Sequence, residues 1–319
     1  MKSFLKYLGL TLGIILISII IFAVYVNSSD IPSYPVEKVS YTAQSTPESV
    51  ERGKKLALML CSGCHRNYET GKLTGVHMTD APPEFGTIYS ANITQDKEFG
   101  IGEWTDAEIM YLLRTGIKRN GKYAPPYMAK LPKMADEDIN AIISFLRSDD
   151  PMVTADATPD KPTEPAFLTK LLCKLAWSPL PMPTEPIPMP DTNNSVELGK
   201  YLAINLECFS CHSADFKTNN FLEPELSEGY FAGGNKPLNR QGQVMLTPNL
   251  TPDMETGLGK WTKAKFIKAV KSGIVDNGPA LALPMQPYTH LTDKEAGAIY
   301  DYLMTIPPIN NKVERSIYE

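Results

Sequence analysis

The sequence lacks the features that mark several common classes of protein. No run rich in lysine and arginine occurs among its 319 residues, and the net charge is −5, so the electrostatic footprint of a nucleic-acid-binding protein is missing. Five cysteines are too few for a disulfide scaffold. Neither half offers a nucleophile beside a base, a pair of carboxylates or a phosphate-binding glycine loop. We therefore expect no nucleic-acid partner and no bond-making catalysis by this chain.

One long apolar segment is present near the amino terminus. Tyr7–Val26 holds twenty residues without a charge, which as a helix would span roughly 30 Å of hydrocarbon. A cleaved signal peptide is the alternative, but its apolar core is usually ~7 to 15 residues long and precedes a cleavage site of small residues. Lys2 and Lys6 precede the segment and Asp30 follows it, so the positive-inside rule places the rest of the chain outside the cytoplasm. The sequence predicts a single-pass anchor, residues 1–29, in the cell inner membrane, with the remainder on the periplasmic side.

Prolines divide the rest of the chain. Ten of the 27 prolines lie between Asp149 and Val196, where they disfavour a continuous helix and favour extended chain. Residues 151–194 are therefore predicted to be a linker between two domains. Within it, the spacing of apolar residues over 166–177 predicts one short helix that packs on a domain or on the membrane surface. Cys173 in this helix has no partner in the pattern and is interpreted as a packed residue, with a reactive or lipidated cysteine as the alternative.

The two halves flanking this linker share an internal repeat. The blocks N-I/L-T and G-I/L-G-x-W-T occur at residues 92–105 and again, shifted by 157, at residues 249–262. The length difference between the halves falls in a loop upstream of these blocks. We therefore expect two related domains, residues 30–150 and 195–319.

Each domain shows the same order of helix signals. First helices are expected from about Pro47 and about Asn194, and middle helices directly after Trp104 and Trp261. Last helices follow from the apolar spacing of residues 139–146 and 296–303. No strand-like alternation appears between them, so the predicted fold class is all-α. A domain of about a hundred residues with long loops has a modest core, so another group is expected to fill its centre.

A second repeated pattern identifies that group. Two stretches share the pattern Cys-x-x-Cys-His, namely Cys61, Cys64 and His65 in the first half and Cys208, Cys211 and His212 in the second. Two thiols three residues apart on a helical turn face one side and can add to the two vinyl groups of one porphyrin, while the adjacent imidazole binds the iron. Zinc would need four ligands where each stretch supplies three, and a redox dithiol would be expected beside a βαβ pattern. The sequence predicts two covalently attached haem c groups.

The sixth iron ligand must come from another part of each domain. The repeat brings Met128 and Met285 to equivalent positions ahead of the last helix, where a thioether ligand would raise the reduction potential and leave no open coordination position. The alternative is that both methionines fill gaps in the core. Met134 aligns with a leucine and is expected in the core. His77 and His290 have no counterparts in the other half, so we interpret them as surface residues, with bis-histidine ligation as the alternative.

Two further pairs of equivalent residues are candidates for contacts with haem propionates. Trp104 and Trp261 could donate indole hydrogen bonds to propionates, and the sequence favours this no more than simple packing. Arg114 and Lys271 could supply positive charge, but solvated cations on a helix face are the commoner arrangement. The propionate contacts of the two tryptophans remain a prediction.

These patterns resemble the class I cytochrome c fold. CSGCH, CFSCH, the paired N-x-T and G-x-G-x-W-T blocks and the methionine ahead of an L-T-D-K-E-A helix are similar to the membrane-associated multi-haem cytochrome c subunits of bacterial alcohol, aldehyde, gluconate and nicotinate dehydrogenases. The resemblance covers about residues 48–148 and 195–308. It implies electron flow from a dehydrogenase through both haems to quinone or a terminal oxidase. The axial ligand pairs that it implies are His65 with Met128 and His212 with Met285.

The chain also departs from this family, and other functions are open at this stage. Many of the family's members have three haem domains and a cleaved signal, whereas this sequence predicts two domains and an anchor. A di-haem subunit of an oxygen-reducing oxidase complex also joins an amino-terminal span to two cytochrome domains. A di-haem peroxidase must open a position on one iron, which two retained methionines disfavour. The preferred interpretation is a membrane-bound electron-transfer protein that is not itself an enzyme.

Overall fold

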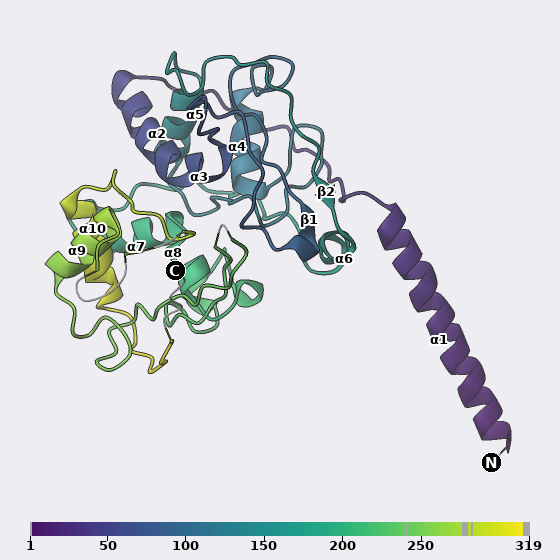
Figure 1. Ribbon diagram of the computed structural model, residues 1–319. Helices are drawn as coiled ribbons and strands as arrows, with labels where there is room; N and C mark the ends of the chain where they lie inside the picture. Colours follow the sequence, from purple (N-terminus) through teal and green to yellow (C-terminus); the bar gives the residue numbers. More distant parts are fainter. Residues whose placement is uncertain (1, 240, 276–279, 282, 315–319) are drawn as a thin grey trace.

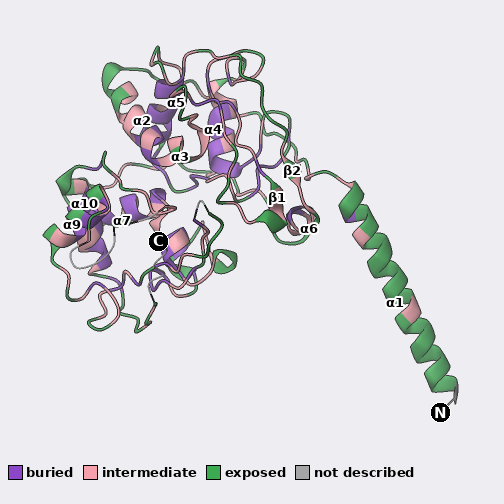
Figure 2. Cartoon of the chain, in the orientation of Figure 1, coloured by how far each residue is buried: buried purple, intermediate pink, exposed green. Residues whose placement is uncertain are grey.

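A computed structural model describes residues 2–239, 241–275, 280–281 and 283–314 of the chain (Figure 1). Helix α1 (Lys2–Ser28) projects away from the rest of the molecule. Its segment Ser3–Ser28 is long and apolar enough to cross a membrane, and its side chains are exposed along most of its length (Figure 2). Its last turn is attached to the rest of the fold, because Val26 is fully buried and the Lys170 Nζ atom donates a hydrogen bond to the Asn27 carbonyl at 2.9 Å.

The first domain contains the three helices that the sequence predicts. Helix α2 (Pro47–Leu60) begins with a capping box in which the Thr46 and Ser49 side chains each accept the other residue's backbone N–H. Helices α4 (Asp106–Thr115) and α5 (Asp136–Leu146) follow, and Thr105 and Glu108 form the capping box of α4. Buried residues of α2, α4 and α5 form the apolar core, with Ile142, Ile143 and Phe145 fully enclosed.

The second domain repeats this arrangement. Helices α7 (Ser195–Asn205), α9 (Lys263–Ser272) and α10 (Asp293–Leu303) correspond to α2, α4 and α5. Their N-caps are Asn194, Thr262 and Thr292, each accepting a backbone N–H on its side-chain oxygen, and Thr292 forms a capping box with Glu295. The predicted all-α fold is thus confirmed, with one amino-terminal apolar helix ahead of two related helical domains.

A glycine sets the distance between the first and last helices of each domain. A Cβ atom added at Gly53 would lie 1.8 Å from the Ala141 carbonyl oxygen, and one added at Gly199 would lie 1.9 Å from the Ala298 carbonyl oxygen. Helices α2 and α5, and likewise α7 and α10, therefore cross with their backbones in contact. Only a residue without a side chain fits at either crossing.

The first part of the linker is attached to the first domain. Strand β1 (Gly86–Thr87) pairs antiparallel with β2 (Glu164–Pro165), with Gly86 opposite Pro165. The predicted short helix is α6 (Phe167–Leu175), which packs on the 3₁₀ turn η1 (Pro83–Phe85) and on the end of α1. The later, proline-rich part is extended and contacts the start of α5, where the Asp136 N–H donates to the Ile187 carbonyl at 2.9 Å.

Candidate haem-binding site

Each Cys-x-x-Cys-His stretch forms a short helix that follows the first long helix of its domain. Helix α3 (Ser62–His65) begins where α2 ends at Cys61, and α8 (Cys208–His212) follows α7 after a break at Glu207. The His65 N–H donates to the Cys61 carbonyl at 2.8 Å, which closes one helical turn over the motif. Both cysteines of each pair therefore lie on a single turn, as the spacing predicts.

The two histidine rings are oriented by backbone carbonyls. The Nδ1 atom of His65 lies 2.7 Å from the Ala91 carbonyl oxygen, and that of His212 lies 3.0 Å from the Pro248 carbonyl oxygen. A carbonyl can only accept a hydrogen bond, so Nδ1 carries the hydrogen and Nε2 presents a lone pair. Shielding from water lowers the pKa of both imidazoles, which favours this neutral form. The donor set fits an iron ligand held in one tautomer by a carbonyl.

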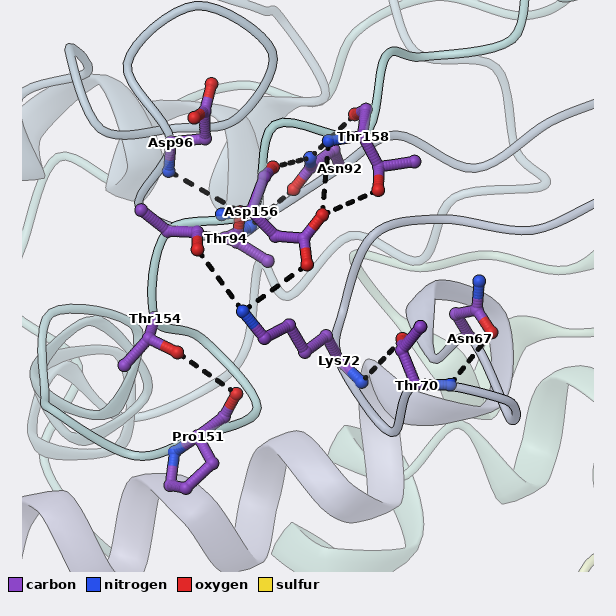
Figure 3. A network of polar contacts seen from close by, with 11 residues as sticks. Asn67, Thr70, Lys72, Asn92, Thr94, Asp96, Pro151, Thr154, Asp156 and Thr158 are labelled. Carbon is purple, nitrogen blue, oxygen red and sulfur yellow. Dashed lines mark hydrogen bonds and ion pairs between the residues drawn. The ribbon is translucent and has the colours of Figure 1, made fainter.

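The repeated N-x-T block holds these carbonyls in place. Ala91 directly precedes Asn92, whose Nδ2 donates to the Asp156 and Thr158 carbonyls at 2.9 Å and whose Oδ1 accepts the Thr94 N–H at 2.9 Å. Figure 3 shows this network, in which Lys72 also pairs with the Asp156 carboxylate at 3.3 Å. Asn92 thus connects two parts of the chain. One is the loop that contains Ala91, whose carbonyl accepts the hydrogen bond from His65, and the other is the segment that follows α5.

The second domain uses its copy of the block in the same way. Pro248 precedes Asn249, whose Nδ2 donates to the Ile309 carbonyl at 2.8 Å and whose Oδ1 accepts the Thr251 N–H at 2.9 Å. The Ile309 N–H in turn donates to the Thr251 hydroxyl at 3.2 Å. The segment after α10 is therefore fixed to the loop beneath His212. In the sequence this block identified the repeat and the family resemblance, whereas its structural role depends on partners about sixty residues away.

The glycines of the G-x-G-x-W-T block lie against the same loop. A Cβ atom at Gly100 would lie 2.3 Å from the Thr94 carbonyl oxygen, and one at Gly257 would lie 2.2 Å from the Thr251 carbonyl oxygen. The final threonines, Thr105 and Thr262, are the N-caps of α4 and α9. The block therefore folds back on the N-x-T turn and starts the middle helix.

The environment of the four thiols is unlike that of a redox-active dithiol. Shielding from water raises the pKa of Cys61 and Cys208 to about 12, and that of Cys64 and Cys211 to about 11. A reactive cysteine needs a lowered pKa, because the thiolate is the nucleophile. Within the described part of the chain, no group of three or more His, Cys, Asp or Glu side chains is placed to hold a metal ion. These surroundings suit cysteines that are bonded to an apolar group.

The two candidate methionines lie half-buried in equivalent loops. Met128 lies between α4 and α5, where its N–H donates to the Pro125 carbonyl at 3.0 Å, and Met285 lies between α9 and α10. Met134 is fully buried in the core, as predicted, and His77 and His290 are exposed, as expected for surface residues. Ligation of iron by Met128 and Met285 remains a prediction.

Arg114 differs from the sequence-based expectation of a solvated cation. Its side chain is 1% exposed, and its guanidinium donates to the carbonyls of Leu131 and Met134 at 2.8 and 2.6 Å and to the Asp136 carboxylate at 2.6 Å. A buried guanidinium needs these acceptors because it cannot lose its charge. Arg114 therefore fixes the chain between Met128 and α5. Its counterpart Lys271 instead forms an ion pair with Asp293 at the start of α10.

The two tryptophans are half-buried beside cations of their own domains. The Arg119 guanidinium lies 6.0 Å from the Trp104 ring centre, and the Lys265 ammonium lies 4.4 Å from that of Trp261. The Trp261 carbonyl accepts a hydrogen bond from the Tyr300 hydroxyl at 2.6 Å. These contacts fix the position of each tryptophan, while the propionate role stays a prediction.

The domains meet through a polar interface that the sequence does not reveal. The Tyr201 hydroxyl on α7 donates to the Asp138 carboxylate on α5 at 2.6 Å and accepts the Ala135 N–H at 3.1 Å. Arg52 pairs with the same buried Asp138 from α2. A second contact joins the Lys55 ammonium of α2 to the Glu295 carboxylate of α10 at 2.5 Å.

This interface brings the two candidate attachment motifs close together. A Cβ atom at Gly63, inside the first motif, would lie 3.6 Å from the side-chain amide of Gln286, the neighbour of Met285. The carboxylate of Glu207, which precedes the second motif, raises the pKa of Cys64 in the first, although burial is the larger cause. The sites that the sequence treats as separate therefore face each other across the domain boundary.

Two helical domains, each with a Cys-x-x-Cys-His turn and an imidazole held by a carbonyl, define a tandem c-type cytochrome. The family model for cytochrome c matches residues 50–149 and 196–307, and the chain belongs to this family.

Among curated proteins, the chain is 28% identical over 285 residues to the cytochrome c subunit of the alcohol dehydrogenase (quinone) of Komagataeibacter europaeus, covering 85% of this chain and 58% of the relative. It is 31% identical over 153 residues to the fructose dehydrogenase cytochrome subunit of Gluconobacter japonicus, covering 47% and 29%. It is also 28% identical over 235 residues to a diheme cytochrome c-type protein of Cereibacter sphaeroides, covering 71% and 74%. The chain spans about three-fifths of the length of the alcohol dehydrogenase subunit.

Proposed function

We propose that this chain is a membrane-anchored electron carrier with two haem c groups that serves a partner dehydrogenase. The observation that carries the proposal is the duplicated Cys-x-x-Cys-His turn, in which a backbone carbonyl holds each imidazole as the Nδ1–H tautomer. That tautomer leaves Nε2 for iron, as an axial ligand requires. The family assignment supports covalent attachment of haem c.

The residues of the chain have distinct roles in this proposal. The cysteine pairs would hold haem through thioether bonds, and His65 and His212 would bind its iron. Met128 and Met285 would complete the set of iron ligands, which would favour electron transfer over peroxide or oxygen chemistry. When bound, haem supplies an iron that accepts and releases one electron. Arg114 assists by holding the loop that carries Met128.

The arrangement of the two domains supports transfer between the two sites. The buried hydroxyl–carboxylate contact of Tyr201 with Asp138 and the ion pair of Lys55 with Glu295 hold the domains together. The first attachment turn then lies beside the chain that carries Met285. We infer that electrons cross this interface inside the molecule before they leave it.

Helix α1 supports the proposed placement of the protein, and the relatives support the proposed class of partner. Helix α1 is taken as an uncleaved anchor in the inner membrane, with both domains on the periplasmic side, because its apolar side chains are exposed. Two of the three relatives named above are cytochrome subunits of an alcohol dehydrogenase and a fructose dehydrogenase. We infer an electron donor of that class and quinone or a terminal oxidase as acceptor.

The first test is haem stoichiometry and ligation in the full chain. Pyridine haemochrome analysis should give two haems per chain, and one haem when either cysteine pair is changed to serine. Met128→His and Met285→His should each lower the midpoint potential of one haem and leave the other unchanged, because histidine stabilises ferric iron more than a thioether does. Potentials that both variants leave unmoved would contradict the axial assignment.

The second test concerns the membrane and the partner. Alkaline carbonate should leave the chain in the membrane pellet and should release a variant that lacks residues 2–28. Extraction in mild detergent, followed by haem staining and mass spectrometry, should show a dehydrogenase subunit that migrates with the chain. Oxidase subunits in its place, or haem-dependent turnover of hydrogen peroxide, would contradict the proposed function.

A further inference from the structure

Glu207 occupies an unusual position at the start of the second attachment motif. It lies between α7 and α8 in a left-handed conformation, with φ of 55°, which is uncommon for a residue other than glycine, asparagine or aspartate. The residue is half-buried, but its carboxylate oxygen Oε1 is closed off from solvent and has no hydrogen-bond partner among the described residues. A buried carboxylate without a partner is costly, so its retention calls for a reason beyond folding.

The carboxylate faces a buried lysine from the other domain. Lys130, 8% exposed, donates to the Pro125 carbonyl at 2.8 Å and lies 5.1 Å from the centre of the Tyr123 ring. Lys130 and Glu207 line one cavity of about 10 Å³, together with Phe209 and other residues of both domains. A cavity of that size holds about one water molecule. Lys130 and Glu207 therefore lie beside one small cavity at the domain boundary, where burial lowers the pKa of Lys130 to about 7.

The internal repeat shows that the fold does not require these charges. The residue equivalent to Glu207 in the first domain is Leu60, at the shift of 147 that relates the two motifs, and it packs against the apolar core. The residue equivalent to Lys130 in the second domain is Pro287, at the shift of 157. The first domain therefore accommodates an apolar residue at the position equivalent to Glu207, and the second domain accommodates one at the position equivalent to Lys130. The charged residues occur only in the copies that face each other.

Glu207 is also close to the cysteines of both attachment motifs. Besides adjoining Cys208, its carboxylate acts on the pKa values of Cys64 and Cys211, in each case beside the larger effect of burial. Cysteines bond to the vinyl edge of a haem, and the charged propionates lie at the opposite edge. A charge beside the cysteines therefore acts where the haem has no charge of its own. In surroundings of low polarity it stabilises ferric iron over ferrous iron.

We propose that the buried Glu207 carboxylate lies between the two haem attachment sites and lowers the reduction potentials of both haems, more strongly in the second domain. This inference rests on the proposed function, because it requires haem at both motifs. Burial raises the pKa of Glu207, the nearby Lys130 opposes this rise, and the net result is a pKa of about 7. The other groups that act on these cysteines or line the site include Asp80 and Lys133, which are both exposed, and Tyr288. Glu207 would thus act on the two iron atoms at a distance, through the electric field of its carboxylate.

The test compares midpoint potentials in the full chain with both haems attached. Spectroelectrochemical titration at about pH 8.5, where the carboxylate is mostly ionised, should show both potentials higher in Glu207→Gln than in the unchanged chain. Glu207→Leu, which introduces the residue of the equivalent position, should show the same upward shift. Glu207→Asp should keep potentials close to those of the unchanged chain, since the charge is retained. Glu223→Gln removes an exposed charge from the same domain and should shift neither potential, because solvent screens it.

The outcomes separate this inference from the proposed function. Unchanged potentials in Glu207→Gln and Glu207→Leu, with two haems attached, would overturn the role of Glu207 and leave the electron carrier intact. A shift in Glu207→Asp as large as that in Glu207→Gln would show that shape, not charge, is responsible. If the protein without any substitution carried no covalent haem, that result would refute the proposed function itself. If Glu207→Gln fails to attach haem, the Leu and Asp variants still decide between charge and shape.

Discussion

A single methyl group at Gly199 should force α7 and α10 apart. In the Gly199→Ala variant the new Cβ atom would lie 1.9 Å from the Ala298 carbonyl oxygen and 2.5 Å from its carbonyl carbon, both of them backbone atoms. Ordinary contacts begin at 3.4 Å, so the helices would have to separate by about 1.5 Å. No side-chain rotation can relieve this overlap, because the neighbour is the helix backbone itself.

The size of the effect follows from the contacts that such a shift removes. A gap of 0.5–1 Å already loses about a quarter to a half of each dispersion contact, and overpacking of a core typically costs about 1–3 kcal/mol. A rigid overlap between two backbones belongs at the upper end, so we expect the free energy of unfolding of the second domain to fall by about 3 kcal/mol. That loss corresponds to an increase of about 100-fold in the population of the open form.

Hydrogen exchange measured by mass spectrometry tests this expectation domain by domain. Backbone amides of α7 and α10 should exchange about 100-fold faster in Gly199→Ala, while those of α2 and α5 in the first domain should change little. Gly297→Ala is the matched control on α10, because the new Cβ would meet a side-chain atom, the Cδ of Lys263, at 3.3 Å and no backbone atom of another helix. The substitution would also gain helix propensity of up to about 1 kcal/mol. Equal exchange rates in the two variants would refute the argument that the crossing at Gly199 admits no side chain.

Two further predictions concern the loop anchors and acid stability. Asn249→Ala should cost about 1–3 kcal/mol of stability in chemical denaturation, because the Ile309 carbonyl loses a buried donor, whereas Asn310→Ala, at an exposed position, should be nearly neutral. Burial opposes ionisation of Asp150, but hydrogen bonds from the Lys54 ammonium, 2.7 Å away, and from the Met152 N–H hold its pKa below the ordinary 3.8. The ionised Asp150 carboxylate contributes its full stabilisation above the pKa that it has in the unfolded chain, and this stabilisation disappears as the pH falls through its lower pKa in the folded protein. The free energy of unfolding should therefore fall less steeply with acid in Asp150→Asn than in the unsubstituted chain. Identical acid profiles of the two proteins would contradict this prediction.

Local patterns in the sequence were sufficient for most of the secondary structure. The helix starts predicted at about Pro47 and directly after Trp104 are decided by capping groups within three or four residues, and the structure confirms them. The internal repeat predicted two related helical domains for the same reason, since each copy carries its own start signals and apolar spacing. The Cys-x-x-Cys-His stretches indicated haem because their chemistry lies within one helical turn.

The surroundings of individual residues depended on partners far away in the chain. Arg114 appeared to be a surface cation because its helical spacing says nothing of the carbonyls of Leu131 and Met134 that enclose it. The role of Asn92 was hidden because its acceptors lie more than sixty residues downstream. The contacts of Arg114 form only when the chain between α4 and α5 folds back on α4, and those of Asn92 only when the segment after α5 folds back.

The sequence by itself determined the two helical domains, the apolar amino-terminal segment and the attachment motifs, because each depends on residues that lie close together in the chain. Tertiary structure alone decided how the domains meet. Tyr201 and Asp138 are sixty-three residues apart, and nothing in either local pattern indicates a hydrogen bond between them. Packing of one domain against the other also enclosed Glu207 and Lys130, because burial depends on which surfaces are brought together and not on the residues that carry the charge.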